Sequence, residues 1–272
     1  MADMGELGSA VEAFAARPRV LVAVDFDGTL APFVLDPLQA RAVPGGLEVL
    51  LAAAGLDGVT VAVVSGRDLK TLSAITGIGP KDAVILIGSH GAQLNLDDNA
   101  DLRPGSDADF LDGEATARLS MLSGELEAIR SRYPEVRLEH KPSAVALHTR
   151  GVDSSVAAAA TTAALQVGER YPGVYVMPGK NVVELTVLET NKGSAVQRLA
   201  RVTNSDATLY VGDDVTDERA FAALDPTAGD LTVKVGDGET AAAQRIPDPA
   251  SVVQLLELFV DRRRAAHPPA GG

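Results

Sequence analysis

The sequence predicts an α/β fold in which a parallel sheet is covered by helices on both faces and a smaller α+β domain is inserted. Near both ends of the chain, continuous apolar runs alternate with helical patterns, as in parallel sheets whose strands are buried on both faces. Between these regions the order becomes helix, two strands, helix, two strands, and alternation within the paired strands favours an antiparallel sheet. We therefore expect a core domain at 1–104 and 189–272 and an inserted domain at 105–188.

The first half of the core is expected to contain buried strands separated by helices. Val20–Val24 is a continuous aliphatic run and predicts the first strand. A helix is expected at Gly45–Ala54, with Pro44 just before it and Gly55 just after it. The remaining elements expected in this half are the strand Val59–Ser65, the helix Asp68–Thr76 and the strand Ala83–Gly88.

The middle of the chain carries the inserted domain. Asn95–Asp112 is acidic and has loop character, and Glu114–Tyr133 has the pattern of a long amphipathic helix. The elements expected next are the strands Val136–His140 and Ala144–His148, a helix near Ser154–Tyr171, and the strands Val174–Met177 and Val182–Val187.

The parallel pattern resumes in the last third of the chain. The expected elements are the helix Gly193–Arg201, the strand Thr208–Val211, the helix Asp217–Leu224, the strand Leu231–Val235 and the helix Ser251–Arg263. The tail after Asp261, RRRAAHPPAGG, is expected to be frayed.

Composition excludes several classes of protein. The net charge of -13, from 24 basic and 37 acidic residues, argues against binding to nucleic acid or to an anionic membrane surface. Without cysteine there are no disulfides, zinc thiolates or catalytic thiols. The start does not resemble a signal peptide, and no apolar run approaches the roughly 18 residues of a membrane span. We therefore expect a soluble cytoplasmic protein without nucleic-acid or membrane partners.

Acidic side chains follow two of the expected strands. Asp25 and Asp27 come just after the first strand, and Asp213 and Asp214 come just after the strand Thr208–Val211. Ligands of parallel α/β sheets bind beyond the carboxyl ends of the strands, so these groups converge if the strands are neighbours. Crowded carboxylates repel one another, and a bound cation removes the conflict. Oxygen ligands without His or Cys favour a hard ion, and a site of few carboxylates, waters and a phosphate suits Mg²⁺.

Phosphoryl transfer gives each of these groups a chemical role. One Asp can attack phosphorus to form an aspartyl-phosphate, and an Asp two residues later can protonate the leaving oxygen and then activate water. Gly28 and Thr29 allow a turn whose amides face phosphate oxygens. Ser65, which ends the second strand, can donate a hydrogen bond to the phosphate, and Lys192 can add positive charge at a helix N-terminus.

Each motif alone has a simpler interpretation. DxD occurs in turns and caps, Ser before a helix is usually an N-cap, an isolated Lys is usually a solvated charge, and GDDVTDE could be an acidic helix start. The combination favours catalysis, because all four occur in this order and each stands at the expected end of a strand or helix.

The four motifs DFDGTL, VVSGR, NKG and VGDDVTDE resemble those of the haloacid dehalogenase (HAD) superfamily of phosphatases. The resemblance implies a Rossmann-like core with a large inserted cap of type C2 between the second and third motifs. It implies that Asp25 is the nucleophile and Asp27 the general acid/base, and that Ser65 and Lys192 stabilise the phosphate. It further implies that Mg²⁺ is bound by Asp25, the main-chain carbonyl of Asp27 and Asp213, with Asp214 and Asp217 supporting the metal or its waters.

Further segments are similar to those of trehalose-6-phosphate phosphatases. They are GSHGAQL (Gly88–Leu94), EHKPSAVALHTR (Glu139–Arg150), PGKNVVEL (Pro178–Leu185) and GDDVTDERAF (Gly212–Phe221). The resemblance implies substrate contacts by residues of the core and of the cap, namely Gly66, Arg67, His90, Lys141, His148, Arg150, Lys180 and Glu184. Two positions depart from the family pattern: Gln93 stands where Glu is usual, and Thr149 where an aromatic residue is usual. The simpler interpretation of the cap residues is a set of ordinary surface charges.

These arguments lead us to expect Mg²⁺-dependent hydrolysis of trehalose 6-phosphate to trehalose and phosphate through an aspartyl-phosphate, with the cap closing over the sugar. One alternative keeps the chemistry and changes the substrate to sucrose 6-phosphate or to mannosyl- or glucosyl-3-phosphoglycerate. Another is a non-catalytic sugar-phosphate sensor or a partner of a synthase. Functional coupling with trehalose-6-phosphate synthase is also expected.

Overall fold

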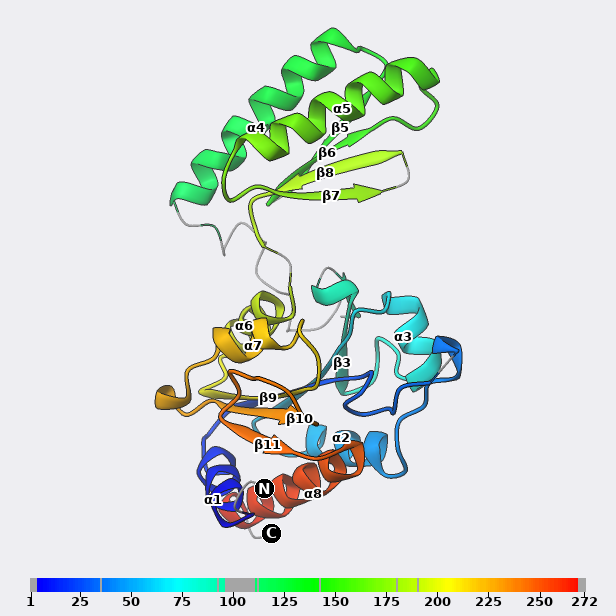
Figure 1. The fold of residues 1–272 in the computed structure, drawn as a ribbon. Helices are drawn as coiled ribbons and strands as arrows, with labels where there is room; N and C mark the ends of the chain where they lie inside the picture. The colour runs from blue at the N-terminus through cyan, green and yellow to red at the C-terminus, as the bar shows by residue number, and fades with distance from the viewer. Residues whose placement is uncertain are drawn as a thin grey trace. The chain divides into compact units, whose positions relative to one another are not determined.

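The computed structural model describes residues 4–34, 36–91, 93–95, 111, 113–141, 143–179, 181–189 and 191–268. The chain folds into two compact units (Figure 1). The first unit combines Met1–Arg103 with Thr190–Gly272, and the second is Pro104–Glu189.

A seven-stranded sheet forms the centre of the first unit, with strand order β11-β10-β9-β1-β2-β3-β4. Every strand runs parallel to its neighbours except β4, which pairs antiparallel with β3. The expected strands are confirmed, whereas the sequence did not indicate β4 or β11, which are too short to carry a periodic pattern. The bounds are β1 Val20–Asp25, β2 Val59–Val64, β3 Val84–Gly88, β4 Gln93–Leu94, β9 Ala207–Gly212, β10 Leu231–Val235 and β11 Gln244–Ile246.

The strand register meets the condition on which the acidic groups were expected to converge. β1 lies between β2 and β9, with Asp25 opposite Val64 and Val24 opposite Val211. The carboxyl ends of these strands therefore meet at one edge of the sheet, which places the residues that follow them close together.

Helices cover both faces of this sheet. One core cluster contains Val20, Val22 and Val24 of β1 together with side chains of α1 (Met4–Ala15), α2 (Gly46–Ala54) and α8 (Pro249–Ala266). Leu72 of α3 (Leu69–Thr76) belongs to the same cluster. α6 (Lys192–Val202) and α7 (Glu218–Ala223) pack with Leu21 and Ala23 in the other. Because both faces are buried, β1 needs apolar side chains at successive positions, which explains its continuous aliphatic sequence.

The end of the chain corrects one expectation. The tail after Asp261 does not fray at that point, because α8 continues to Ala266 and the side chain of Arg263 is buried. The guanidinium of Arg263 donates hydrogen bonds to main-chain carbonyls of the segments that lead into β1 and β2, namely those of Ala15, Arg17, Pro18 and Asp57. α1, which packs against α8, was also not anticipated from the sequence.

The second unit is a four-stranded antiparallel sheet with strand order β5-β6-β8-β7. Alternate residues of β6 and β8, such as Val145 and Leu185, join the apolar cluster formed with the two helices of the unit. Ala146 and Glu184, which are paired across the strands, therefore point to the other face. The elements are α4 Gly113–Arg132, β5 Arg137–His140, β6 Ala144–His148, α5 Ser154–Arg170, β7 Tyr175–Gly179 and β8 Val182–Thr186.

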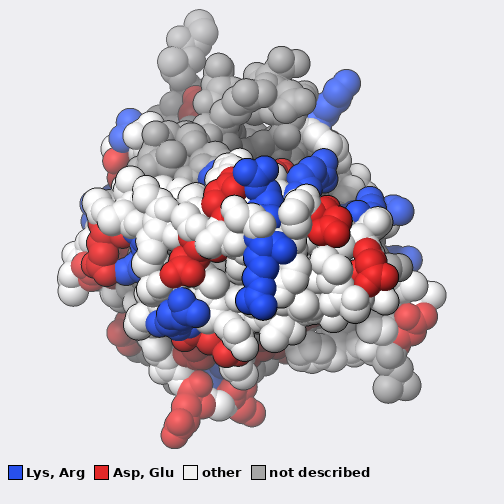
Figure 2. Space-filling view, turned by 90° about the horizontal axis from the view of Figure 1, so that it is seen from above, with Lys and Arg blue, Asp and Glu red and all other residues white. Residues whose placement is uncertain are grey.

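The surface has few large apolar side chains. Acidic and basic side chains are intermixed on the face shown in Figure 2. Among the described residues, the exposed large apolar side chains are Phe33, Val34, Leu38, Leu51, Tyr175, Met177 and Val215. None of the helices in the described ranges is long and apolar enough to cross a lipid bilayer.

Candidate active site

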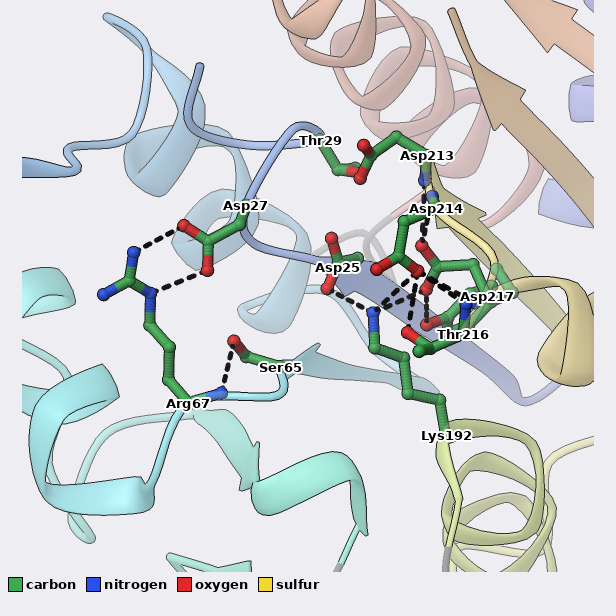
Figure 3. A network of polar contacts seen from close by, with 11 residues as sticks. Asp25, Asp27, Thr29, Ser65, Arg67, Lys192, Asp213, Asp214, Thr216 and Asp217 are labelled. Atoms are coloured by element: carbon green, nitrogen blue, oxygen red, sulfur yellow. Dashed lines mark hydrogen bonds and ion pairs between the residues drawn. The ribbon is translucent and has the colours of Figure 1, made fainter. Parts of the chain in front are cut away.

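The turn after β1 brings acidic groups from two strands into contact. Asp25 is the last residue of β1, and Gly28, three residues later, has a φ of 85°. A Cβ at Gly28 would lie 2.1 Å from the carboxylate oxygen Oδ2 of Asp213. Thr29 donates a hydrogen bond of 3.0 Å from its Oγ1 to Oδ1 of the same carboxylate (Figure 3). Gly28 is therefore needed both for its backbone conformation and for the space that Asp213 occupies.

Three carboxylates form a cluster that could hold a cation. Asp25, Asp213 and Asp217 each offer an oxygen that lies within 4.8 Å of the others. Burial raises the pKa of Asp25 well above its usual value, and the nearby charges of Asp217 and Asp213 act in the same direction, partly opposed by Lys192. Burial also raises the pKa of Asp213. An all-oxygen donor set whose charged form is disfavoured without a counterion fits a hard divalent cation such as Mg²⁺.

Lys192 supplies a positive charge to this cluster. It is the first residue of α6, is buried, and donates from Nζ to Oδ1 of Asp25 at 2.7 Å and to Oδ1 of Asp217 at 2.8 Å. Burial disfavours the charged form of Lys192, but the attraction of Asp25 and Asp217 exceeds that penalty, so its pKa is raised. The lysine is therefore held as a cation directly beside Asp25.

Asp217 organises the loop that carries Asp213 and Asp214. Its carboxylate is fully buried and accepts four hydrogen bonds. Oδ1 accepts from Lys192 and from the hydroxyl of Tyr210, and Oδ2 accepts from the main-chain amides of Asp213 and Asp214. Because both oxygens are already engaged, the geometry supports an organising role for Asp217.

Tyr210 is a functional candidate that the sequence reasoning missed. Burial is the main cause that raises its pKa, followed by the charge of Asp217, so the hydroxyl remains a neutral donor. A tyrosine in a mostly aliphatic strand, two residues before GDD, was the available signal.

Asp27 and Asp214 lie outside the three-carboxylate cluster. Arg67 binds the carboxylate of Asp27 through two hydrogen bonds of 2.6 Å, from Nε to Oδ2 and from Nη2 to Oδ1 (Figure 3). Asp214 is half-exposed, and its Oδ1 accepts from the amide and hydroxyl of Thr216. The main-chain carbonyl of Asp27 and the carboxylate of Asp214 remain proposed metal contacts.

Arg67 connects the general acid/base candidate to a neighbouring segment. Besides the two bonds to Asp27, its Nη1 donates to the carbonyl of Pro37 at 2.7 Å. Its main-chain amide donates to Oγ of the buried Ser65 at 3.2 Å. The expected substrate-binding arginine thus contacts Asp27.

A cleft of about 340 Å³ brings most of the predicted core residues together. It is lined by Asp25, Asp27, Phe33, Pro37, Ser65, Gly66, Arg67, His90, Lys192 and Asp214. A cavity of about 510 Å³ lies elsewhere in the first unit, between α1, β11 and α8, and its lining is mainly apolar. The charged and hydrogen-bonding groups that phosphate chemistry requires are in the smaller cleft.

One wall of the cleft has a constrained backbone. Ser89 and His90 have positive φ values of 50° and 55°, which non-glycine residues adopt uncommonly. A Cβ at Gly66 would lie 2.5 Å from Cε1 of His90, so the glycine allows the imidazole to approach the main chain next to Ser65. Strain of this kind is characteristic of functional sites.

Gln93, one of the two departures from the family pattern, supports this wall. Its Oε1 accepts from the main-chain amide of Leu69 at 2.8 Å and from Oγ of Ser89 at 3.1 Å. A glutamate could accept the same two bonds, so this departure preserves the local structure.

The substrate residues expected in the second unit form pairs within that unit. Lys141 Nζ donates to Oε2 of Glu184 at 2.5 Å, and His148 Nε2 lies 2.8 Å from Oε2 of Glu139. The hydrogen bond with His148 lowers the pKa of Glu139. Arg150 is exposed in the turn after β6, and Lys180 lies outside the described residues.

Comparisons with known proteins agree on one family. The trehalose-phosphatase family model matches residues 23–248. A bifunctional trehalose-6-phosphate synthase/phosphatase from Thermoproteus tenax is 33% identical over 249 residues, covering 90% of this chain and 32% of the relative. A trehalose-phosphate phosphatase from Mycobacterium tuberculosis is 31% identical over 269 residues, covering 96% of this chain and 66% of the relative. The chain thus spans about a third of the first relative and slightly under two thirds of the second.

Solved structures show the same fold. The trehalose-6-phosphate phosphatase of Aspergillus fumigatus matches with a TM-score of 0.58 and 24% identity, covering 94% of this chain and 97% of that one. The C-terminal domain of the C. albicans trehalose-6-phosphate phosphatase matches with a TM-score of 0.56 and 22% identity, covering 94% and 96%. The expected Rossmann-like core of HAD type with an inserted cap is therefore confirmed. By its sequence match, this chain belongs to the trehalose-phosphatase family.

Proposed function

We propose that this chain hydrolyses trehalose 6-phosphate to trehalose and phosphate through a covalent aspartyl-phosphate on Asp25. The observation that carries the proposal is the cleft in which Asp25, Asp27, Ser65 and Lys192 lie together. Family membership supports the phosphatase chemistry, and the activities for which the relatives are named support the sugar.

In the first half-reaction, a carboxylate oxygen of Asp25 attacks phosphorus and the bond from phosphorus to the sugar oxygen breaks. Asp27, in its protonated form, gives its proton to that leaving oxygen, and trehalose departs. Lys192 holds Asp25 in place at 2.7 Å and offsets part of the negative charge that gathers around phosphorus. Oγ of Ser65 donates a hydrogen bond to a phosphoryl oxygen.

In the second half-reaction, Asp27 acts as the base. It removes a proton from water, whose oxygen attacks phosphorus, and the bond between phosphorus and Asp25 breaks. The products are inorganic phosphate and the Asp25 carboxylate, and Asp27 is again protonated for the next turnover. The guanidinium of Arg67 donates hydrogen bonds to both oxygens of the Asp27 carboxylate. We therefore expect substrate binding to break at least one of these two hydrogen bonds before Asp27 donates its proton.

The acidic cluster fits a magnesium ion. Asp25, Asp213 and the main-chain carbonyl of Asp27 would bind it, with Asp214 and Asp217 supporting the ion or its waters. When bound, the ion supplies charge neutralisation for the phosphoryl group and for the crowded carboxylates. The raised pKa values of Asp25 and Asp213 support this assignment, because burial, and to a smaller extent the neighbouring carboxylates, disfavour their charged forms, which a bound cation would stabilise.

The second unit is proposed to supply selectivity for the sugar. The pair of Lys141 and Glu184 is partly exposed and can donate to and accept from hydroxyls, and polar groups that a bound sugar buries would reject substrates that cannot pair with them. His148, Arg150 and Lys180 are proposed to take part as well. The fusion of synthase and phosphatase in the T. tenax relative supports the further proposal that a trehalose-6-phosphate synthase supplies the substrate.

The proposal is tested by phosphate release from a panel of esters, with Mg²⁺ and with a chelator. The panel holds trehalose 6-phosphate, sucrose 6-phosphate, mannosyl- and glucosyl-3-phosphoglycerate and an aryl phosphate. We expect trehalose 6-phosphate to be the preferred ester and the chelator to stop turnover. Preference for another ester would replace the proposed substrate, and no release from any ester would favour a non-catalytic sensor.

Two variants test the roles of the residues. Asp25→Asn should lose all measurable turnover and form no acid-stable, hydroxylamine-sensitive phosphoprotein, and retained turnover would refute the nucleophile. Glu184→Ala should lower kcat/KM for trehalose 6-phosphate far more than for the aryl phosphate, whereas equal losses would remove its role in sugar recognition.

A further inference from the structure

Phe33 is unusual among the phenylalanines of the described residues. Its side chain is 73% exposed, whereas those of Phe14, Phe26, Phe221 and Phe259 are buried. Phe33 also lines the cleft that contains Asp25 and Lys192. An exposed aromatic ring beside polar catalytic groups is typical of a ligand site, where apolar contact area accompanies a few orienting polar groups.

The segment that carries Phe33 is tied to the catalytic residues. The carbonyl of Pro37 accepts a hydrogen bond from Arg67, whose other two donors hold Asp27. The carboxylate of Asp36 caps the short 3-10 helix Pro37–Gln39 by accepting from the amide of Leu38 at 3.0 Å. Pro37, which lines the cleft together with Phe33, is thus held by the same arginine that holds Asp27.

Asp27 marks where the leaving group must lie. In the proposed reaction it protonates the oxygen that joins phosphorus to the sugar, so that oxygen lies within hydrogen-bond distance of its carboxylate and the first sugar ring begins one exocyclic carbon beyond it. Asp27, Phe33 and Pro37 line the same cleft, so a sugar ring that extends from the leaving oxygen at Asp27 comes within reach of Phe33.

The geometry points to Phe33 as a specificity-determining residue that stacks on the pyranose ring next to the phosphate, a role that rests on the proposed function. A pyranose presents an apolar face of C–H groups, and an aromatic ring offers a flat apolar partner without competing for hydroxyls. A phosphate ester without such a ring gains nothing from this contact. Phe33 thereby favours phosphorylated hexopyranosides over small alkyl phosphates.

The experiment compares two probes of the same cleft in the full chain with Mg²⁺. Trehalose 6-phosphate reports the ring contact through kcat/KM, and inorganic phosphate reports the phosphate subsite through its competitive inhibition constant. Phe33→Ala should lower kcat/KM about tenfold, equivalent to about 1.4 kcal/mol, and raise KM more than it lowers kcat. The inhibition constant of phosphate should change by less than about twofold, because phosphate has no ring.

Matched variants separate stacking from other roles. Phe33→Tyr retains the ring and should stay within about twofold of the unaltered protein in kcat/KM. Leu38→Ala removes an exposed apolar side chain from the same segment, outside the cleft lining, and should leave both readouts unchanged.

The possible results distinguish the two proposals. Without phosphate release from trehalose 6-phosphate by the unaltered chain, the proposed function fails. If that release is observed and Phe33→Ala leaves kcat/KM unchanged, only the stacking role is wrong. A parallel rise in the inhibition constant of phosphate, or an equal loss in Leu38→Ala, would also overturn stacking, since Phe33 would then act by shaping the segment.

Discussion

Replacing Asp217 by Asn tests whether this residue organises the catalytic loop. The Asp217 carboxylate accepts from Lys192, from Tyr210 and from the amides of Asp213 and Asp214. An Asn side chain retains one oxygen and presents an NH2 group to the other two donors, so two buried donors lose their acceptor. Each such loss costs about 1–3 kcal/mol. Two such losses cost about 2–6 kcal/mol, and relief of repulsion among the carboxylates offsets about 1 kcal/mol, which leaves a loss of about 1–5 kcal/mol in the free energy of unfolding.

The assay is hydrogen exchange at the amides of β1 and β9 in a chelator, since these strands report the stability of the first unit. Asp214→Asn is the matched control. Its Oδ1 remains to accept from Thr216, and its side chain is half-exposed, so we expect a loss below about 1 kcal/mol. If Asp217→Asn lost no more stability than Asp214→Asn, Asp217 would not be the organising residue. With Mg²⁺ restored, Asp217→Asn should also turn over at least about 100-fold more slowly, because either Lys192 or the loop of Asp213 loses its acceptor on residue 217.

Three further predictions use other features of the first unit. Asp213→Asn should stabilise the metal-free protein at pH 7, because burial raises the pKa of Asp213 in the folded state and ionisation of this carboxyl then disfavours folding. The gain in the urea midpoint should shrink as the pH falls toward about 3.9, the pKa of Asp in the unfolded chain. A gain that does not depend on pH would contradict this prediction. Gly28→Ala should reduce phosphate release at least about 100-fold, because the added methyl group overlaps the Asp213 carboxylate. Gly77→Ala is the control and should remain active: Gly77 also has a positive φ, but a Cβ added there meets no neighbouring atom within 4 Å. Arg263→Met should lower the free energy of unfolding by about 2–4 kcal/mol through the loss of its bonds to main-chain carbonyls, and a change as small as that of the exposed Arg264→Met would show that these bonds contribute little.

The positions of the expected strands and of the acidic residues were predictable because their signals are local. A strand buried on both faces requires consecutive apolar residues, and Val20–Val24 shows this pattern without reference to any partner. The position of Asp25 at the carboxyl end of that run then follows from counting residues. The expectation that Asp25 would meet Asp213 used only the general rule for parallel sheets, and the register of β1 with β9 confirms it.

Other features depended on contacts between residues distant in the chain. The sequence led us to expect Arg67 at the substrate, and it did not indicate that the guanidinium donates hydrogen bonds to Asp27, which lies 40 positions earlier in the chain. The charged run at 262–264 has the sequence of a frayed end, yet Arg263 is buried because carbonyls 206 to 248 positions away accept its hydrogen bonds. The amino-acid composition around Arg67 or Arg263 carries no information about hydrogen-bond partners that lie far away in the chain.

By itself, the sequence determined which residue types stand at the ends of which strands, and therefore the class of chemistry, because strand periodicity and residue charge are properties of short segments. Only the tertiary structure decided which acids share a cation site, that Asp217 and Tyr210 support that site, and that Phe33 is exposed inside the cleft. The physical reason is that pKa, burial and hydrogen-bond partnership depend on what surrounds a side chain, and those surroundings are assembled from segments that the chain order keeps far apart.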